Sequence, residues 1–175
     1  MINKSCPEFK FLAFFIVLFF SLIDNTYAYN VYYVANTGND SNPGTSISPF
    51  RSLQKGVDAA AAGDTIIVKD GIFGPEKANH GSMPVNINKA GTTSAWITLK
   101  AQHRWGAILD CRFTAHSYIN FEANSAYWKI RDFEIRNGYS GDIWANSGGA
   151  RNIIISGNHI HHIGRQEADA VVKTT

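Results

Sequence analysis

An internal repeat constrains the fold of this chain more than any other feature of its sequence. The segment WKIRDFEIRNG (128–138) matches IIISGNHIHHI (153–163) at a shift of 25 positions, with apolar residues at the same three slots and a polar turn between them. Residues 97–99 match residues 128–130 at a shift of 31, as expected for a coil with a longer loop. Such a repeat of short strands and turns predicts a parallel β-solenoid, because one coil alone cannot bury its inward face.

Alternation of apolar and polar residues assigns the two faces of the predicted solenoid. The strands are only three to five residues long, and every second side chain is apolar. Leucine-rich repeats have a similar period, but the segment lacks their leucine framework. The predicted fold class is therefore all-β. The side chains expected to point inward are Ile130, Ile135, Ile153, Ile155 and Ile160.

Residues 1–28 predict a secretory signal peptide. Two lysines precede an uncharged, almost wholly apolar stretch at residues 11–23, and residues 26–28 offer a small-x-small cleavage site. A helix of that length rises about 20 Å, which is less than the roughly 30 Å core of a bilayer. We expect cleavage after Ala28 and a secreted, periplasmic or cell-surface protein with no remaining membrane attachment. A retained N-terminal anchor is the alternative.

Charge and cysteine content narrow the function classes. The chain has 16 Lys and Arg against 14 Asp and Glu, and this net charge of +2 is too small and too scattered to indicate a nucleic-acid partner. Cys6 lies in the predicted signal peptide, so Cys111 has no partner for an intrachain disulfide and is expected to be a small packed thiol. The exported chain must then be held by core packing.

Residues 29–95 are predicted to form an N-terminal strand, a capping helix and the first strands, and residues 96–175 the coils of the solenoid. Ser48 followed by Pro49 predicts the N-cap and first residue of the helix, and Gly63 predicts its end. The apolar face of the helix comprises Phe50, Leu53, Val57 and Ala60. A helix laid over the first coil would cover exposed strand edges.

This segment resembles the N-terminal cap of right-handed parallel β-helix proteins of the pectate lyase-like superfamily, nearest the group of family 9 polysaccharide lyases and uncharacterised relatives. The residues that carry the cap pattern are Gly38, Asp40, Asn42, Pro43, Gly44, Thr45, Pro49, Phe50, Gly63, Asp64, Thr65 and Gly71. Phe73 stands where the family has tyrosine. The later segments AWITLKAQ, AYWKIRDFEIRNG and ARNIIISGNHIHHIG resemble its first coils. The resemblance implies a right-handed parallel β-helix with an N-terminal helical cap.

The resemblance also implies a reaction. Members of the superfamily that cleave uronic-acid polymers use β-elimination, in which Lys or Arg removes the C5 proton and Ca²⁺ is held by Asp residues of the middle coils. No residue here matches those positions, and the chain holds only about three coils. The expected function is an exported pectate or uronan lyase-like protein using calcium, or an inactive N-terminal fragment of one if the catalytic groups lie after Thr175. The alternative is a non-catalytic, adhesin-like β-helix that binds glycans.

Local candidates for a substrate site lie near the end of the repeat. His159 and His161 flank Ile160 and are expected to face outward together, and Arg165 nearby could meet a sugar carboxylate. The alternative is a polar outer face without a binding role, since zinc would require a third ligand. An outward stripe that could bind an acidic glycan, or be merely solvated, comprises Lys129, Arg131, Glu134 and Arg136.

Other polar and aromatic residues receive mainly structural interpretations. The cap aspartates Asp40 and Asp64 are expected to organise turns rather than to bind a metal. Asn158 is expected to turn inward and to satisfy backbone groups with its amide. Trp105 and Tyr139 are better candidates for stacking on a sugar ring than Trp128, which occupies an inward slot.

Overall fold

The structure is a computed structural model that describes residues 28–75, 83–141, 143–145 and 148–164. Its elements are β1 (Val31–Val34), α2 (Leu53–Ala59), β2 (Thr65–Val68), β3 (Gly71–Phe73), β4 (Val85–Ile87), β5 (Ile97–Ala101), β6 (Ala107–Asp110), β7 (Ile119–Phe121), β8 (Ala126–Arg131), β9 (Glu134–Arg136), β10 (Ile143–Ala145), β11 (Arg151–Ser156) and β12 (His159–His161). Residues 1–27 lie outside the described part, so cleavage of the leader remains a prediction.

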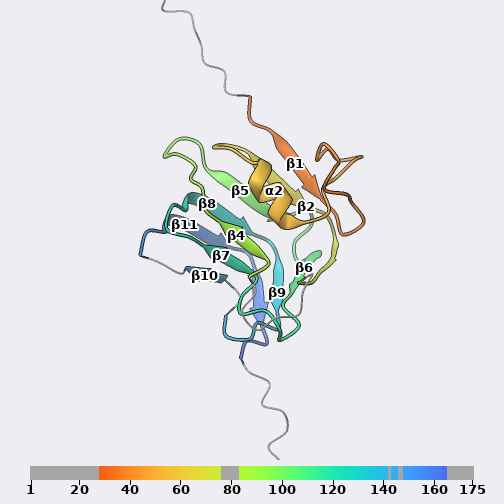
Figure 1. Cartoon of the computed structure of the whole chain (residues 1–175), viewed down its shortest axis with the longest axis vertical. Coiled ribbons are helices and arrows are strands. Elements are labelled where there is room, and N and C mark those ends of the chain that lie inside the picture. Colours follow the sequence, from red (N-terminus) through yellow and green to blue (C-terminus); the bar gives the residue numbers. More distant parts are fainter. Residues whose placement is uncertain (1–27, 76–82, 142, 146–147, 165–175) are drawn as a thin grey trace, which may run out of the picture.

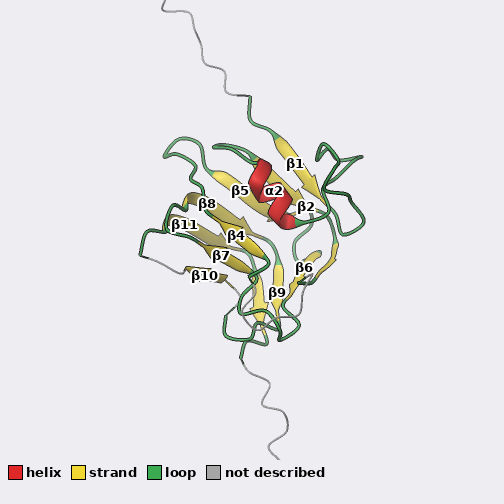
Figure 2. Ribbon diagram, in the orientation of Figure 1, coloured by secondary structure: helices red, strands yellow, loops and turns green. Residues whose placement is uncertain are grey.

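The strands form three sheets in which every pair is parallel (Figures 1 and 2). The first sheet has the order β1-β2-β5-β8-β11, the second β3-β6-β9-β12 and the third β4-β7-β10. Each coil gives one strand to each sheet in turn, beginning with β2, β3 and β4 and continuing to β11 and β12. This arrangement is a parallel β-helix, and the all-β prediction is confirmed.

The strand register confirms the repeat. Ile153 lies beside Trp128 and Ile160 beside Ile135, so both pairs are 25 positions apart. Strand β5 lies beside β8 with Ile97 opposite Trp128, a shift of 31. The repeat therefore arises because side chains of successive coils stack into continuous columns.

The predicted inward isoleucines occupy these columns, but their burial changes along the solenoid. Ile130 and Ile135 are fully buried, and Ile153 is partly buried against the core. Ile155 and Ile160, one coil later, are 48% and 39% exposed. The difference follows from stacking, because no strand among the described residues lies on the far side of β11 or β12.

Helix α2 caps the start of the solenoid and contacts β1, β2 and β4 (Figure 1). Its N-cap is Ser52, whose hydroxyl accepts the N–H of Lys55 at 3.2 Å, so the prediction of Ser48 as N-cap was wrong. Phe50 forms a β-bridge with Val34, and this pairing keeps the chain extended past the predicted start. Helix α2 also ends at Ala59, before the predicted stop at Gly63.

The predicted apolar face of the cap is confirmed, since all of its members are at most 4% exposed: Phe50, Leu53, Val57 and Ala60. No helix in the described ranges is long and apolar enough to cross a bilayer. The prediction of a packed thiol is also confirmed, because Cys111 is fully buried.

The two cap aspartates hold turns together, as predicted. Asp40 accepts the backbone N–H groups of Arg51 and Ser52 at 2.8 and 2.9 Å and the Ser52 hydroxyl at 2.8 Å. Burial tends to raise the pKa of Asp40, but these hydrogen bonds and the charge of Lys55 outweigh it and hold the pKa below its usual value. Asp64 is 2% exposed, and its carboxylate accepts two backbone N–H groups at 2.7 and 2.8 Å.

Gly38 is a position of the cap where a side chain has no room. An added Cβ would lie 2.3 Å from the carbonyl oxygen of Phe50 and 2.7 Å from that of Pro49. The variant Gly38→Ala is expected to lower the free energy of unfolding by about 1–3 kcal/mol, because backbone atoms must move. Urea denaturation followed by circular dichroism measures this loss. In the control Gly148→Ala, the added Cβ has no heavy atom within 4 Å. An equal loss of unfolding free energy in this control would contradict the packing explanation.

Candidate functional site

The outer face of the second sheet gathers several titratable side chains into columns. Glu134 lies beside His159 across β9 and β12, and Arg136 lies beside His161. Asp110 of β6 lies on the other side of Arg136. The structure thus brings the two predicted histidines to one outer face, while their role in substrate binding stays a prediction. Arg165, the third predicted site residue, lies outside the described residues.

An ion-pair network fixes Arg136 on this face. Its Nε donates to Asp110 Oδ2 at 3.1 Å, and its Nη1 donates to Glu134 Oε1 at 2.9 Å. Hydrogen bonding to Asp110 is the main cause that raises the pKa of Arg136 above its usual value. Because two carboxylates neutralise this guanidinium, Arg136 is a poor anchor for a sugar carboxylate.

Asp110 is held in its charged form. Burial tends to raise the pKa of Asp110, but hydrogen bonds from the Asn137 amide, the Arg112 N–H and the Arg136 side chain, together with the Arg136 charge, outweigh it. The net effect is a pKa below the usual value. The Asn137 Nδ2 and Arg112 N–H donors both lie 2.9 Å from Asp110 Oδ1.

The histidines meet a carboxylate from the preceding coil. His161 Nε2 lies 3.3 Å from Glu134 Oε1, and His161 Nδ1 is in hydrogen-bond contact with His162 Nδ1. One possible ligand atom from each of Glu134, His159 and His161 lies within 4.8 Å of the others. The sequence did not suggest that Glu134 joins the two histidines, although the 25-residue shift aligns it with His159.

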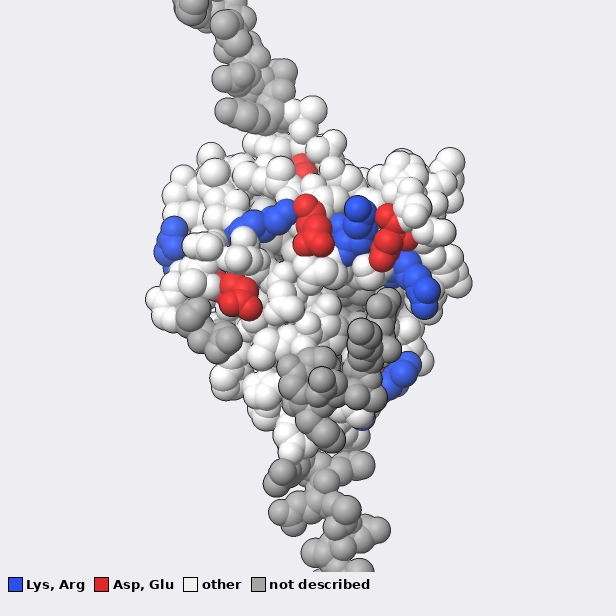
Figure 3. Space-filling model, in the orientation of Figure 1, with Lys and Arg blue, Asp and Glu red and all other residues white. Residues whose placement is uncertain are grey.

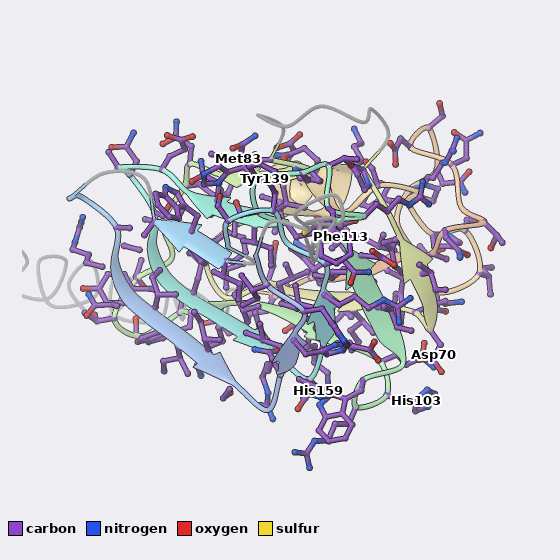
Figure 4. The ribbon with its side chains drawn as sticks, turned by 90° about the horizontal axis from the view of Figure 1, so that it is seen from below. Asp70, Met83, His103, Phe113, Tyr139 and His159 are labelled. Carbon is purple, nitrogen blue, oxygen red and sulfur yellow. The ribbon has the colours of Figure 1, made fainter. Side chains whose placement is uncertain are left out.

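An exposed tryptophan lies beside these rings. Trp105 is 42% exposed, and its ring centre lies 5.2 Å from that of His159. Its Nε1 donates to the Gly157 carbonyl at 2.8 Å, and the Arg104 guanidinium lies 4.6 Å from the ring centre. Trp105 is therefore accessible to a ligand, and its role in stacking remains a prediction. Figure 4 shows His159 on the same side of the molecule as the pair formed by His103 and Asp70.

Two buried or half-buried side chains have the structural roles predicted for them. Trp128 is fully buried, with its Nε1 donating to the Lys89 carbonyl at 2.8 Å. Asn158 accepts the N–H of Phe133 at 2.9 Å and donates to the Ile130 carbonyl at 3.0 Å, so its amide satisfies the backbone of the preceding coil.

The charged stripe expected from the sequence divides between two sheets. Lys129 and Arg131 face outward from the first sheet, while Glu134 and Arg136 face outward from the second. Lys100 lies beside Arg131 in register. We call Lys100, Lys129 and Arg131 the basic strip.

The basic strip carries no opposing acid within its own strands. The outward positions of β2, β5 and β8 hold no Asp or Glu among the described residues. Lys129 Nζ lies 5.4 Å from the centre of the Trp96 ring, and Arg131 pairs at 3.3 Å with Asp132 in the following turn. By contrast, Figure 3 shows acidic and basic side chains intermingled on the face that bears α2.

The described residues do not fit a calcium ion. Calcium takes about six to eight oxygen ligands. The metal-ligating side chains that converge in the described part are Glu134, His159 and His161, which supply two nitrogens. The carboxylate of Asp110 is engaged by Arg136 and backbone or amide donors. No catalytic step through calcium follows from these residues.

Stacked parallel coils, a helical cap and polar outer faces define a capped parallel β-helix protein. The chain belongs to the Pel9A-like right-handed β-helix family, whose model, described as "Pel9A-like, right handed beta helix region", matches residues 32–172. The predicted resemblance and the right-handed fold are thereby confirmed.

Comparison with curated proteins gives relatives that are named pectate lyases. Pectate lyase PEL9 of Emericella nidulans is 29% identical over 119 residues, which cover 61% of this chain and 28% of the relative. Pectate lyase L of Dickeya dadantii is 28% identical over 116 residues, which cover 63% of this chain and 27% of the relative. The chain thus spans little more than a quarter of the length of these relatives.

Solved structures agree on the fold. The crystal structure of pectate lyase Pel9A has a TM-score of 0.54 and 25% identity, covering 77% of this chain and 34% of that one. A rhamnogalacturonan lyase has a TM-score of 0.61 and 22% identity, covering 77% of this chain and 36% of that one, and supports the fold alone.

Proposed function

We propose that this chain is an exported polysaccharide lyase-like protein that acts on an acidic polysaccharide, pectate or another uronan. The observation that carries the proposal is family membership over residues 32–172, with pectate lyases among the relatives. In the proposal, β-elimination with calcium belongs to the whole protein. It is assigned to no residue described here, because these residues do not fit calcium.

The basic strip supports a binding role for the outer face of the first sheet. Lys100, Lys129 and Arg131 lie on two adjacent strands, whose backbones are about 4.8 Å apart. A row of cations is complementary to a polymer that bears a carboxylate on each sugar ring. Arg136 is less suitable, because Asp110 and Glu134 neutralise it.

Removing the basic strip is expected to weaken binding to polygalacturonate. Each exposed charge pair contributes about 0.2–1 kcal/mol. The variant Lys100→Gln/Lys129→Gln/Arg131→Gln should therefore bind about three- to a hundred-fold more weakly by isothermal titration calorimetry. Binding of the unchanged chain should also weaken as salt is added, since salt screens exposed charges.

A variant with the same change in net charge distinguishes the effect of the basic strip on binding from the effect of net charge. Arg51→Gln/Lys55→Gln/Arg112→Gln removes the same charge from exposed positions outside the first sheet, and it should bind nearly as well as the unchanged chain. Equal weakening in both triple variants would contradict a specific role for the strip.

The ultraviolet absorbance of unsaturated products, recorded with polygalacturonate and added calcium, tests catalysis. Product formation supports the lyase proposal. Binding without product would favour the alternative, a non-catalytic β-helix that binds glycans. If the chain neither binds polygalacturonate nor forms product, both proposed functions of this chain are contradicted.

A further inference from the structure

We propose that Glu134, His159 and His161 form a binding site for a divalent transition metal ion such as zinc. The three residues come from adjacent strands β9 and β12, and Glu134 lies directly opposite His159. Their ligand atoms lie within 4.8 Å of one another. The set supplies the third ligand that two histidines alone lack.

The distances suit a small ion. Zinc binds histidine nitrogen and carboxylate oxygen at about 2.0–2.2 Å, so two ligand atoms of a tetrahedral site lie about 3.4 Å apart. The 3.3 Å between His161 Nε2 and Glu134 Oε1 already has this separation. His159 is exposed, and one of its ring nitrogens lies within 4.8 Å of the other two ligand atoms.

The histidines are supported from outside the ligand set. The other ring nitrogen of His161, Nδ1, contacts Nδ1 of His162, so the ring is held at its second nitrogen. The His159 ring lies 5.2 Å from Trp105, which is itself anchored by its hydrogen bond to Gly157. These contacts orient the rings before any ion binds.

The local charge also favours a cation. Asp110 and Glu134 together carry two negative charges against the single positive charge of Arg136. Arg136 competes for Glu134, but it keeps its 3.1 Å contact with Asp110 when Glu134 turns toward a metal. The Arg104 guanidinium lies 4.6 Å from the centre of the Trp105 ring.

The ligand types select the class of metal. Two imidazole nitrogens with one carboxylate suit zinc and neighbouring first-row metals, whereas calcium prefers oxygen ligands alone. Three protein ligands leave a position for water or a substrate oxygen. This inference is independent of the proposed function, because it concerns another kind of ion and needs no lyase activity.

Zinc titration of the untagged chain, in competition with a coloured chelator, tests the site. We expect one zinc ion per chain. Glu134→Gln and His161→Gln should each weaken binding about ten-fold or more, because each removes one of the three ligands. The control His103→Gln removes an exposed histidine that pairs with Asp70 outside the cluster, and it should leave zinc binding unchanged.

Cobalt(II) provides a readout that needs no variant. A four- or five-coordinate site with nitrogen ligands should give visible bands far stronger than those of hydrated cobalt. A spectrum of hydrated cobalt, the absence of saturable zinc binding, or equal weakening in His103→Gln would each overturn the proposal. Circular dichroism of each variant verifies that it is folded.

Discussion

Replacing Trp128 with alanine is expected to lower the free energy of unfolding by about 3–5 kcal/mol. Trp128 is fully buried in β8, and its neighbours in the adjoining coils are Ile97 and Ile153. The substitution opens a cavity in a column that three coils share. It also removes the donor to the Lys89 carbonyl, which then loses a hydrogen bond. Urea denaturation followed by far-ultraviolet circular dichroism measures the loss.

The same substitution at Trp105 is the control. Trp105 is 42% exposed and contributes one hydrogen bond through its ring nitrogen, so Trp105→Ala should cost only about 0.5–1.5 kcal/mol. Equal losses in the two variants would contradict the assignment of inward and outward faces.

The coil repeat could be predicted because stacking imposes it on the sequence. Each inward slot requires an apolar side chain against the equivalent slot of the next coil, so the 25-residue shift between Trp128 and Ile153 is visible without a structure. The helix start was not visible in this way. Ser48 followed by Pro49 predicted the N-cap, but the bridge between Phe50 and Val34 keeps the chain extended until Ser52, and this bridge joins distant parts of the chain.

The candidate site could be predicted only between strands that are related by the 25-residue repeat. Alternation alone placed His159 and His161 on one outer face, and the same shift of 25 positions leads back to Glu134. The ion pair of Arg136 with Asp110 could not be found with a single repeat length. Asp110 and Arg136 are 26 positions apart, whereas paired residues of β5 and β8 in the same two coils are 31 apart, because the loops between the sheets differ in length.

A turn explains why the charged stripe divides. Arg131 ends β8 on the first sheet, and Glu134 begins β9 on the second. Between them Asp132 has a φ of 68°, a left-handed conformation that turns the chain from one sheet to the next. Alternation predicts only that these side chains face outward. The bend decides which outer face each one joins.

Substituting Arg136 with glutamine is expected to lower the free energy of unfolding by about 1–3 kcal/mol at neutral pH. Arg136 is the cation shared by Asp110 and Glu134, whose side chains are 13% and 18% exposed. Glutamine leaves two partly buried carboxylates close together without that charge. The control Arg131→Gln breaks a pair whose arginine is 48% exposed, and it should cost about 0–1 kcal/mol. Equal losses would contradict a special role for the Arg136 network.

The loss of unfolding free energy caused by Arg136→Gln should also depend on pH. Burial raises the pKa of Asp110, but hydrogen bonds from Asn137, the Arg112 N–H and Arg136 lower it by more than burial raises it. The folded-state pKa of Asp110 therefore lies below the unfolded value of about 3.9. Such a group contributes stability that is complete above the unfolded pKa and is lost as the pH falls through the folded pKa. Arg136→Gln removes part of this depression, so the difference from the unchanged chain should narrow below about pH 4. Urea denaturation at a series of pH values between 7 and 3 measures the narrowing, and a difference that stays constant down to pH 3 would show that the charge of Asp110 does not stabilise the fold through Arg136.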